Sequence, residues 1–143
     1  MIARLATLAL VCALAACGQL APPAQSPPEL NGRWRVQQIA GGSLGAGVSI
    51  YFDIENGAVS GVTGCNAFTA RTHAIGRSIS FDTIEETQES CASAAAQTDE
   101  TRFLRVLPSV RRFSRNGRML ELLPQEFGES LILLRREDEP SPG

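Results

Sequence analysis

The sequence contains no lysine, because all 13 of its basic residues are arginines. This absence excludes a Schiff-base lysine, a phosphate-loop lysine and a Ser-Lys dyad. His73 is the only histidine and no two cysteines form a CxxC pair, which disfavours a zinc site. We therefore expect neither a metal nor a cofactor. Acidic residues and arginines are interspersed at a net charge of -2, so no basic face predicts nucleic-acid binding.

The first 16 residues have the three parts of a secretory signal peptide. Arg4 supplies a positive charge, residues 5–14 form an uncharged apolar run, and Ala15 and Ala16 are the small residues that precede a cleavage site. The apolar run is shorter than the about 20 residues that span a bilayer. We expect residues 1–16 to be removed.

The sequence Leu14-Ala15-Ala16-Cys17 resembles the bacterial lipobox, in which the cysteine becomes the first mature residue and takes a diacylglycerol. Such a cysteine usually carries two or three acyl chains, palmitate among them, and stable anchoring needs at least two. Gly18, rather than Asp, follows the cysteine and resembles an outer-membrane sorting signal. The resemblance implies a lipoprotein anchored through Cys17 to the cell envelope, at the outer membrane and facing the periplasm.

Two cysteines remain in the mature chain after Cys12 leaves with the signal peptide and Cys17 takes lipid. These are Cys65 and Cys91, an even pair in a chain sent to an oxidising compartment. The count favours a disulfide, which the chain-entropy model values at about 3 to 4 kcal/mol. Two buried free thiols, or half of a metal site, are the alternatives that the residues leave open.

Prolines divide the mature chain into a linker, one domain and a tail. Residues 17–29 hold four prolines, which exclude a helix or a central strand and predict an extended spacer. Residues 30–136 form the domain, which we expect to be monomeric. Residues 137–143 are polar and are expected to be a disordered tail.

The domain shows mostly the pattern of short strands. Val48, Ile50, Phe52 and Ile54 alternate with polar residues, a period of two that is typical of a half-buried strand. Two Asn-Gly pairs predict tight hairpin turns, at residues 56–57 and 116–117. Residues 33–39 and 78–83 predict two further strands, and the apolar run 131–134 predicts a central strand that is covered on both faces.

One segment predicts a helix. It runs from 93 to 106, with Ser93 as its N-cap and Pro108 just beyond its end. The residues expected to face the sheet are Ala96, Phe103, Leu104 and Leu107. The sequence thus predicts a mostly β domain: seven or eight antiparallel strands in a small barrel or half-barrel, with one inserted helix.

Residues 60–68 read Ser-Gly-Val-Thr-Gly-Cys-Asn-Ala-Phe and resemble the Gly-Cys-Asn signature of the META domain family, which includes HslJ-like bacterial lipoproteins. Residues 30–34, which end in Trp34, resemble the family's opening strand. Thr87, four residues before Cys91, resembles a second family motif. Further matches lie in the helix, at Glu100, Phe103, Leu104 and Leu107. The positions of this sequence that match the family's motifs are Gly64, Cys65, Asn66, Thr87 and Cys91.

The resemblance implies a lipocalin-like antiparallel half-barrel with one helix, and a role in envelope stress or antibiotic tolerance. It also exposes one departure. Glu89 stands where the family often has an apolar residue, so either this loop is exposed here or Glu89 has a polar partner.

No residue pattern indicates catalysis. His73 would need an activated nucleophile, and nothing marks Thr69, Thr72 or Ser78 as one. The cluster of Glu85, Glu86 and Glu89 is typical of a solvated loop. We expect Gly64 to permit a turn and Asn66 to satisfy backbone groups. The domain is predicted not to be an enzyme.

The expected partners are the membrane, through the lipid anchor, and an apolar ligand or another envelope protein. The second hairpin is flanked by four arginines: Arg111, Arg112, Arg115 and Arg118. Because alternate residues of a strand point to opposite faces, these arginines are divided between two faces and predict only a weak contact with anionic lipid or a protein partner. Two alternative functions stay open. One is a pilotin-like carrier that uses the barrel interior, and the other is an inhibitor of periplasmic hydrolases.

Overall fold

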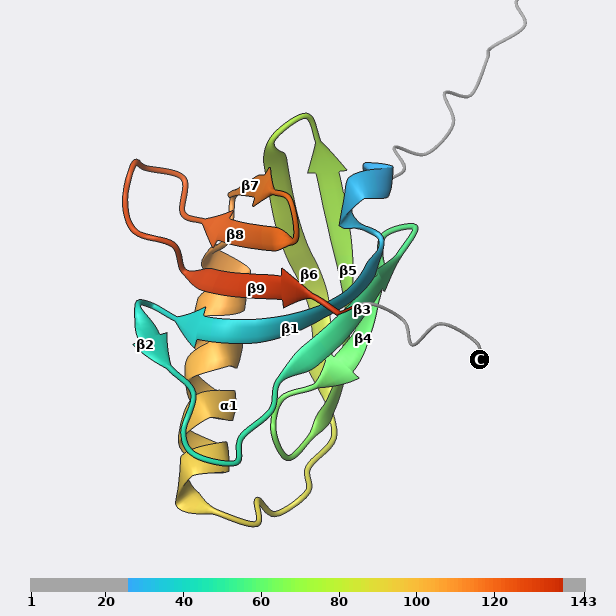
Figure 1. Cartoon of the computed structure of the whole chain (residues 1–143). Helices are drawn as coiled ribbons and strands as arrows, with labels where there is room; N and C mark the ends of the chain where they lie inside the picture. Colours follow the sequence, from blue (N-terminus) through green and yellow to red (C-terminus); the bar gives the residue numbers. More distant parts are fainter. Residues whose placement is uncertain (1–25, 138–143) are drawn as a thin grey trace, which may run out of the picture.

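A computed structural model describes residues 26–137 of the chain (Figure 1). The strands are β1 (Gly32–Ile39), β2 (Gly42–Ser43), β3 (Tyr51–Glu55), β4 (Ala58–Val62), β5 (Ala67–Ile75), β6 (Ser78–Glu86), β7 (Arg112–Asn116), β8 (Met119–Leu123) and β9 (Ile132–Arg136). The helices are α1 (Ala94–Val106) and two 3-10 turns, η1 (Pro28–Leu30) and η2 (Leu107–Ser109).

Eight of these strands form a closed antiparallel barrel. The order runs β1-β3-β4-β5-β6-β7-β8-β9, and β9 pairs back to β1 to close the circle, while β2 is an extra strand at the edge of β1. The mostly β prediction with one helix is confirmed. The barrel is weakest between β6 and β7, whose register contains one pair, Ser78 with Arg112. The segment that holds α1 is inserted at this point.

Both predicted hairpins form, but their turns differ. Asn56 and Gly57 have φ values of 50° and 85°, as the predicted turn with two left-handed residues requires. In the second hairpin Asn116 pairs with Met119 and belongs to β7. Gly117, with a φ of 57°, is therefore the first central residue of the turn. A glycine with positive φ at that position is typical of a type II′ turn.

The barrel interior is filled by apolar side chains from the barrel strands and α1. Aromatic rings form its centre: Phe52 lies 6.0 Å from Phe68, and Phe103 of α1 lies 5.4 Å from Phe68, between ring centroids. Trp34 is fully buried and donates its indole N–H to the carbonyl of Leu30 at 2.8 Å. Because these rings bury large areas, they supply much of the stabilisation of the fold.

Helix α1 begins as predicted, because the Ser93 hydroxyl accepts the backbone N–H of Ala96 at 3.1 Å. Ala96, Phe103 and Leu107 are buried, whereas Leu104 is only half-buried against the core. The buried face also carries two carboxylates that the apolar pattern did not predict, Asp99 and Glu100.

The prediction that the strand over 131–134 is covered on both faces is wrong for its outer face. β9 is central in pairing, between β8 and β1, and its Ile132 and Leu134 are buried. Leu131 and Leu133 are half-buried. The reason is that α1, seen behind β1 and β9 in Figure 1, sends Phe103 into the core, so the outer face of β9 is only partly covered.

The folded domain extends beyond both expected boundaries. Ser26 is buried and its hydroxyl lies 3.5 Å from the carbonyl of Thr72, and the η1 turn forms within the expected linker. At the other end, Glu137 donates its backbone N–H to the Arg33 carbonyl at 2.9 Å and so belongs to the domain rather than the tail. No helix within residues 26–137 is long and apolar enough to cross a membrane.

Candidate functional site

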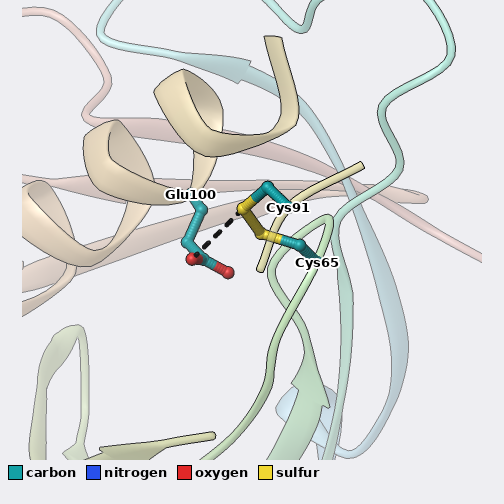
Figure 2. A group of neighbouring side chains, drawn as sticks. All are labelled: Cys65, Cys91 and Glu100. Atoms are coloured by element: carbon teal, nitrogen blue, oxygen red, sulfur yellow. Dashed lines mark hydrogen bonds between the residues drawn. A yellow bond between two sulfur atoms is a disulfide. The ribbon is translucent and has the colours of Figure 1, made fainter. Parts of the chain in front are cut away.

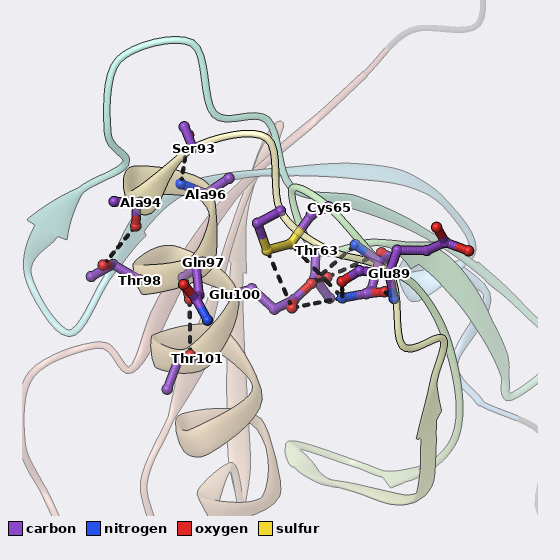
Figure 3. The surroundings of a disulfide bond; sticks show 12 residues. Thr63, Cys65, Glu89, Ser93, Ala94, Ala96, Gln97, Thr98, Glu100 and Thr101 are labelled. Atoms are coloured by element: carbon purple, nitrogen blue, oxygen red, sulfur yellow. Dashed lines mark hydrogen bonds between the residues drawn. A yellow bond between two sulfur atoms is a disulfide. The ribbon is translucent and has the colours of Figure 1, made fainter.

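The predicted motif residues come together beside the start of α1, where two loops are joined by a disulfide (Figure 3). Cys65, in the loop after β4, is bonded to Cys91, in the loop after β6. Gly64 has a φ of 108°, and a Cβ there would lie 3.1 Å from Cγ1 of Val48. The prediction of a tight turn at Gly64 is confirmed, because an L side chain would be strained there.

Asn66 holds the second loop through its side-chain amide. Its Oδ1 accepts the backbone N–H of Glu89 at 2.7 Å and the hydroxyl of Thr87 at 2.9 Å. Its Nδ2 lies 3.4 Å from the Glu89 carbonyl. Thr87 also accepts the backbone N–H of Ala67 at 3.2 Å. The motif threonine and asparagine therefore clamp the two loops together, independently of the disulfide.

Glu100 of α1 completes this cluster, and its carboxylate lies beside the disulfide (Figure 2). Its Oε1 accepts Nδ2 of Asn66 at 2.8 Å, and its Oε2 accepts the backbone N–H of Asn66 at 3.0 Å. The buried hydroxyl of Thr63 also donates to Oε2. Three donors on an acceptor-only group satisfy a buried carboxylate. Within residues 26–137 no buried side-chain nitrogen or oxygen lacks a hydrogen-bond partner.

We call Thr63, Asn66, Thr87, Glu100 and the Cys65–Cys91 disulfide the polar lock. The sulfur atoms and a Glu100 oxygen lie within 4.8 Å of one another, with Cys91 Sγ 3.9 Å from Oε1. Metal ions bind the thiolate form of cysteine, and sulfurs bonded to each other are not thiolates. In this oxidation state the polar lock is a structural cluster.

Of the two possibilities for Glu89, an exposed loop or a polar partner for its carboxylate, the structure shows the exposed loop. The Glu89 side chain is exposed, and its backbone, not its carboxylate, is bound by Asn66. The position can therefore carry a charged residue because it faces solvent.

A second polar contact fixes α1 to the β2 region. Asp99 is buried and accepts the backbone N–H of Gly45 at 2.6 Å. Its other oxygen pairs with Arg102 at 2.9 Å, and Arg102 donates to the Ile39 carbonyl at 2.6 Å. Sequence reasoning missed this contact, because Asp99 reads as an ordinary charged residue of a helix.

His73 lies on the outer face of β5, where its Nε2 is 3.3 Å from an oxygen of Asp82. Ser80 is its cross-strand neighbour in the register. The histidine and aspartate side chains are 65% and 51% exposed. The pair therefore lies on an open sheet surface. Of the residues near His73 in sequence, Thr72 is buried with its hydroxyl donating to the Ser80 carbonyl at 2.9 Å.

The glutamates that follow one another in sequence are exposed. Glu85 and Glu86 help line a shallow hollow of about 250 Å³ next to the polar lock. Its other lining residues are Ala67, Phe68, Thr69 and Thr87.

The four arginines of the second hairpin have separate roles, as the alternation predicted. Arg111 donates to the Pro108 carbonyl at 2.7 Å, and Arg112 to the Pro124 carbonyl at 3.0 Å. Arg115 reaches the carbonyl of Glu29 at 3.1 Å and lies over the Trp34 ring. Arg118 donates to the Arg136 carbonyl at 3.1 Å and lines a different, strongly basic hollow, considered below. The predicted lipidation site, Cys17, lies outside the described residues.

Fold and site together define a small antiparallel β-barrel whose motif loops are joined to each other by a disulfide and to one helix by a buried carboxylate. Residues 28–138 match the family model of the META domain, and the chain belongs to this family. The family resemblance seen in the sequence is confirmed. No match was found among curated proteins.

Two solved structures share the fold. A protein from Burkholderia xenovorans, determined by NMR, is similar with a TM-score of 0.64 and 18% identity, over 96% of this chain and 100% of that one. A second protein determined by NMR is similar with a TM-score of 0.59 and 12% identity, over 75% of this chain and 90% of that one. At these identities the similarity shows the fold alone.

Proposed function

We propose that this protein is a lipid-anchored lipoprotein of the bacterial envelope, whose META domain is a non-enzymatic module that binds or stabilises a component at the membrane surface. The observation that carries the proposal is the combination of the lipobox-like sequence ending in Cys17 with the disulfide between Cys65 and Cys91. Disulfides persist in oxidising compartments such as the periplasm, which an exported lipoprotein enters.

The design of the domain supports a rigid module rather than an enzyme. The motif residues that could have carried chemistry are used in holding loops: Asn66 bonds two backbone groups of Glu89, and Glu100 accepts three donors from Thr63 and Asn66. A catalytic carboxylate or amide needs bonding capacity left for substrate. In the polar lock this capacity is taken up within the protein.

The filled interior supports binding on the outer surface. Phe52, Phe68 and Phe103 meet at the centre of the barrel, where a carrier of apolar ligands would need space. We therefore favour a surface role, in envelope stress or antibiotic tolerance, over the pilotin-like carrier; a hydrolase inhibitor would also act through the outer surface and stays the alternative.

The anchor is tested with the full chain in a Gram-negative host, comparing the wild type with Cys17→Ala. We expect the wild type in the membrane fraction, labelled by palmitate and cut before Cys17, as intact mass shows. The Cys17→Ala chain should lose the label and the cleavage. A wild-type chain that is soluble and unlabelled would overturn the proposal.

The stress role is tested in a strain that lacks the gene. Complementation with the wild type should restore growth under cell-wall antibiotics, and Cys17→Ala should restore it much less. His73→Ala is the matched control for an enzyme: it should complement fully, and loss of complementation by this variant alone would contradict the non-enzymatic role.

A further inference from the structure

A basic hollow lies on the outer face of the barrel, where the first half of β1 meets the end of β9. Its volume is about 400 Å³. Six residues line it, four of them arginines and one of them acidic: Arg35, Gln37, Arg118, Arg135, Arg136 and Glu137. We call this surface the arginine hollow.

Two of its arginines face each other across the sheet. Arg35 of β1 is the direct cross-strand partner of Arg135 of β9. In such a pair the Cβ atoms lie about 5 Å apart, and like charges placed directly opposite destabilise the sheet. The register that brings them together continues past a bulge between Val36 and Gln38. The barrel therefore holds two positive charges side by side on a face that is open to solvent.

Glu137 is the one acidic residue among the described residues that line the hollow. Glu137 pairs with Arg35, with Nε and Oε1 2.5 Å apart. Among residues 26–137, none forms a hydrogen bond or ion pair with the Arg135 guanidinium. Asp53 is already held by Arg33 at 2.9 Å, and this hydrogen bond raises the pKa of Arg33. Asp53 is thus committed to Arg33, and among the described residues that line the hollow arginines outnumber carboxylates.

One of the lining residues, Arg136, is held by the core. The guanidinium of Arg136 lies 5.7 Å from the centre of the buried Trp34 ring. Gly32 leaves room for it, since a Cβ at Gly32 would come within 2.9 Å of Nη2 of Arg136. Arg118 is held to the Arg136 carbonyl. A basic surface that is already ordered loses less entropy when it binds an anion.

The hollow lies close to the point where the N-terminal segment enters the domain. In Figure 1, η1 leads directly into β1. Arg35 is in the first half of β1, which runs from Gly32 to Ile39. Residues 18–25 can span at most about 30 Å between the lipidated Cys17 and Ser26. A domain anchored in this way stays within reach of the lipid headgroups.

We propose that the arginine hollow binds the phosphate group of anionic phospholipids, so that the outer face of β1 and β9 rests on the membrane that carries the anchor. Arginine suits this ligand because its planar fork donates two hydrogen bonds to the oxygens of one phosphate. The inference that the phosphate belongs to a membrane lipid rests on the proposed lipid anchor. Binding of phosphate by the arginine hollow does not itself require the anchor.

The test uses the chain from residue 17 onward with Cys17→Ser, which has no lipid and keeps every strand of the barrel. Binding is measured by co-sedimentation with vesicles of phosphatidylcholine alone, and of phosphatidylcholine mixed with phosphatidylglycerol. We expect binding to the mixed vesicles only, and a loss of about 30-fold in the double variant Arg35→Gln/Arg135→Gln, from two arginines at the surface. The matched control, Arg71→Gln/Arg105→Gln, removes the same charge from exposed residues outside the hollow and should change binding less than twofold.

Equal losses in both double variants would overturn the proposal, because binding would then follow net charge. Equal binding to both kinds of vesicle would also overturn it. A titration with inorganic phosphate, followed by NMR of the arginine side chains, separates the two sources. Binding of free phosphate without binding of mixed vesicles would contradict the lipid assignment. Absence of the palmitate label from the wild-type full chain, by contrast, would overturn the proposed anchor. It would not affect the result of the vesicle test, which uses a chain without lipid.

Discussion

Asn66 and Glu100 are 34 positions apart in sequence and share two hydrogen bonds, from the Asn66 amide to Oε1 at 2.8 Å and from its backbone N–H to Oε2 at 3.0 Å. This contact joins the family's Gly-Cys-Asn motif to the helix and makes the motif a structural element.

Glu100→Ala is expected to lower the free energy of unfolding by about 2 to 4 kcal/mol, because it leaves buried donors of Thr63 and Asn66 without an acceptor. Urea denaturation followed by tryptophan fluorescence measures the change. The control is Glu86→Ala, an exposed carboxylate whose loss should stay within about 0.5 kcal/mol. Equal effects of the two substitutions would rule out a supporting role for Glu100.

Cys65→Ala/Cys91→Ala is expected to cost about 3 to 4 kcal/mol, because the disulfide closes a loop with a sequence separation of 26. The same loss should follow reduction of the wild type and should not add to that of the double variant. Alkylation of the denatured, unreduced protein should leave both cysteines unmodified. Modification of either one would mean that the bond is absent in the native protein.

Gly61→Ala is expected to prevent folding or to cost more than about 3 kcal/mol, because the new Cβ would lie 2.2 Å from the Tyr51 carbonyl oxygen and 2.5 Å from the Phe52 Cβ. Gly47→Ala is the comparison. Gly47 has a φ of 75° and open space around it, so alanine there should cost only about 1 to 2 kcal/mol. Circular dichroism and thermal melting distinguish these outcomes, and a Gly61→Ala protein that melts like the wild type would contradict the β3–β4 register.

Arg102→Ala is expected to cost about 1 to 3 kcal/mol, since it removes the ion pair to buried Asp99 and the hydrogen bond to the Ile39 carbonyl. Hydrogen exchange at Gly45, whose N–H is held by Asp99, should speed up more than exchange in β5. Arg105→Ala, on the exposed face of α1, is the control and should change neither quantity.

Local patterns predicted the strands, the hairpins and the helix, because periodicity and capping residues act over a few positions. Ser93 as the N-cap and the alternation that buries Ile50, Phe52 and Ile54 are examples. The count of cysteines favoured the pairing of Cys65 with Cys91 but left free thiols and a half metal site open, and the structure shows the disulfide.

What the sequence could not supply depends on contacts between distant residues. Glu100 matched the family's helix, but its burial and that of Asp99 were not predicted, and only the positions of Gly45 and Asn66 show why both are buried. The closure of the barrel needs β1 to meet β9, which no local pattern encodes. The facing pair Arg35 and Arg135 depends on the same closure.

The central claim, that the family motif holds the fold together through α1, is tested most directly by a double-mutant cycle on Asn66→Ala and Glu100→Ala. The free energy of unfolding of both single variants and the double variant is measured by urea denaturation. Because the two residues are direct partners, the double variant should lose less than the sum of the single losses by at least about 1 kcal/mol. Losses that add to within about 0.5 kcal/mol would contradict the account, because the motif and the helix would then be independent.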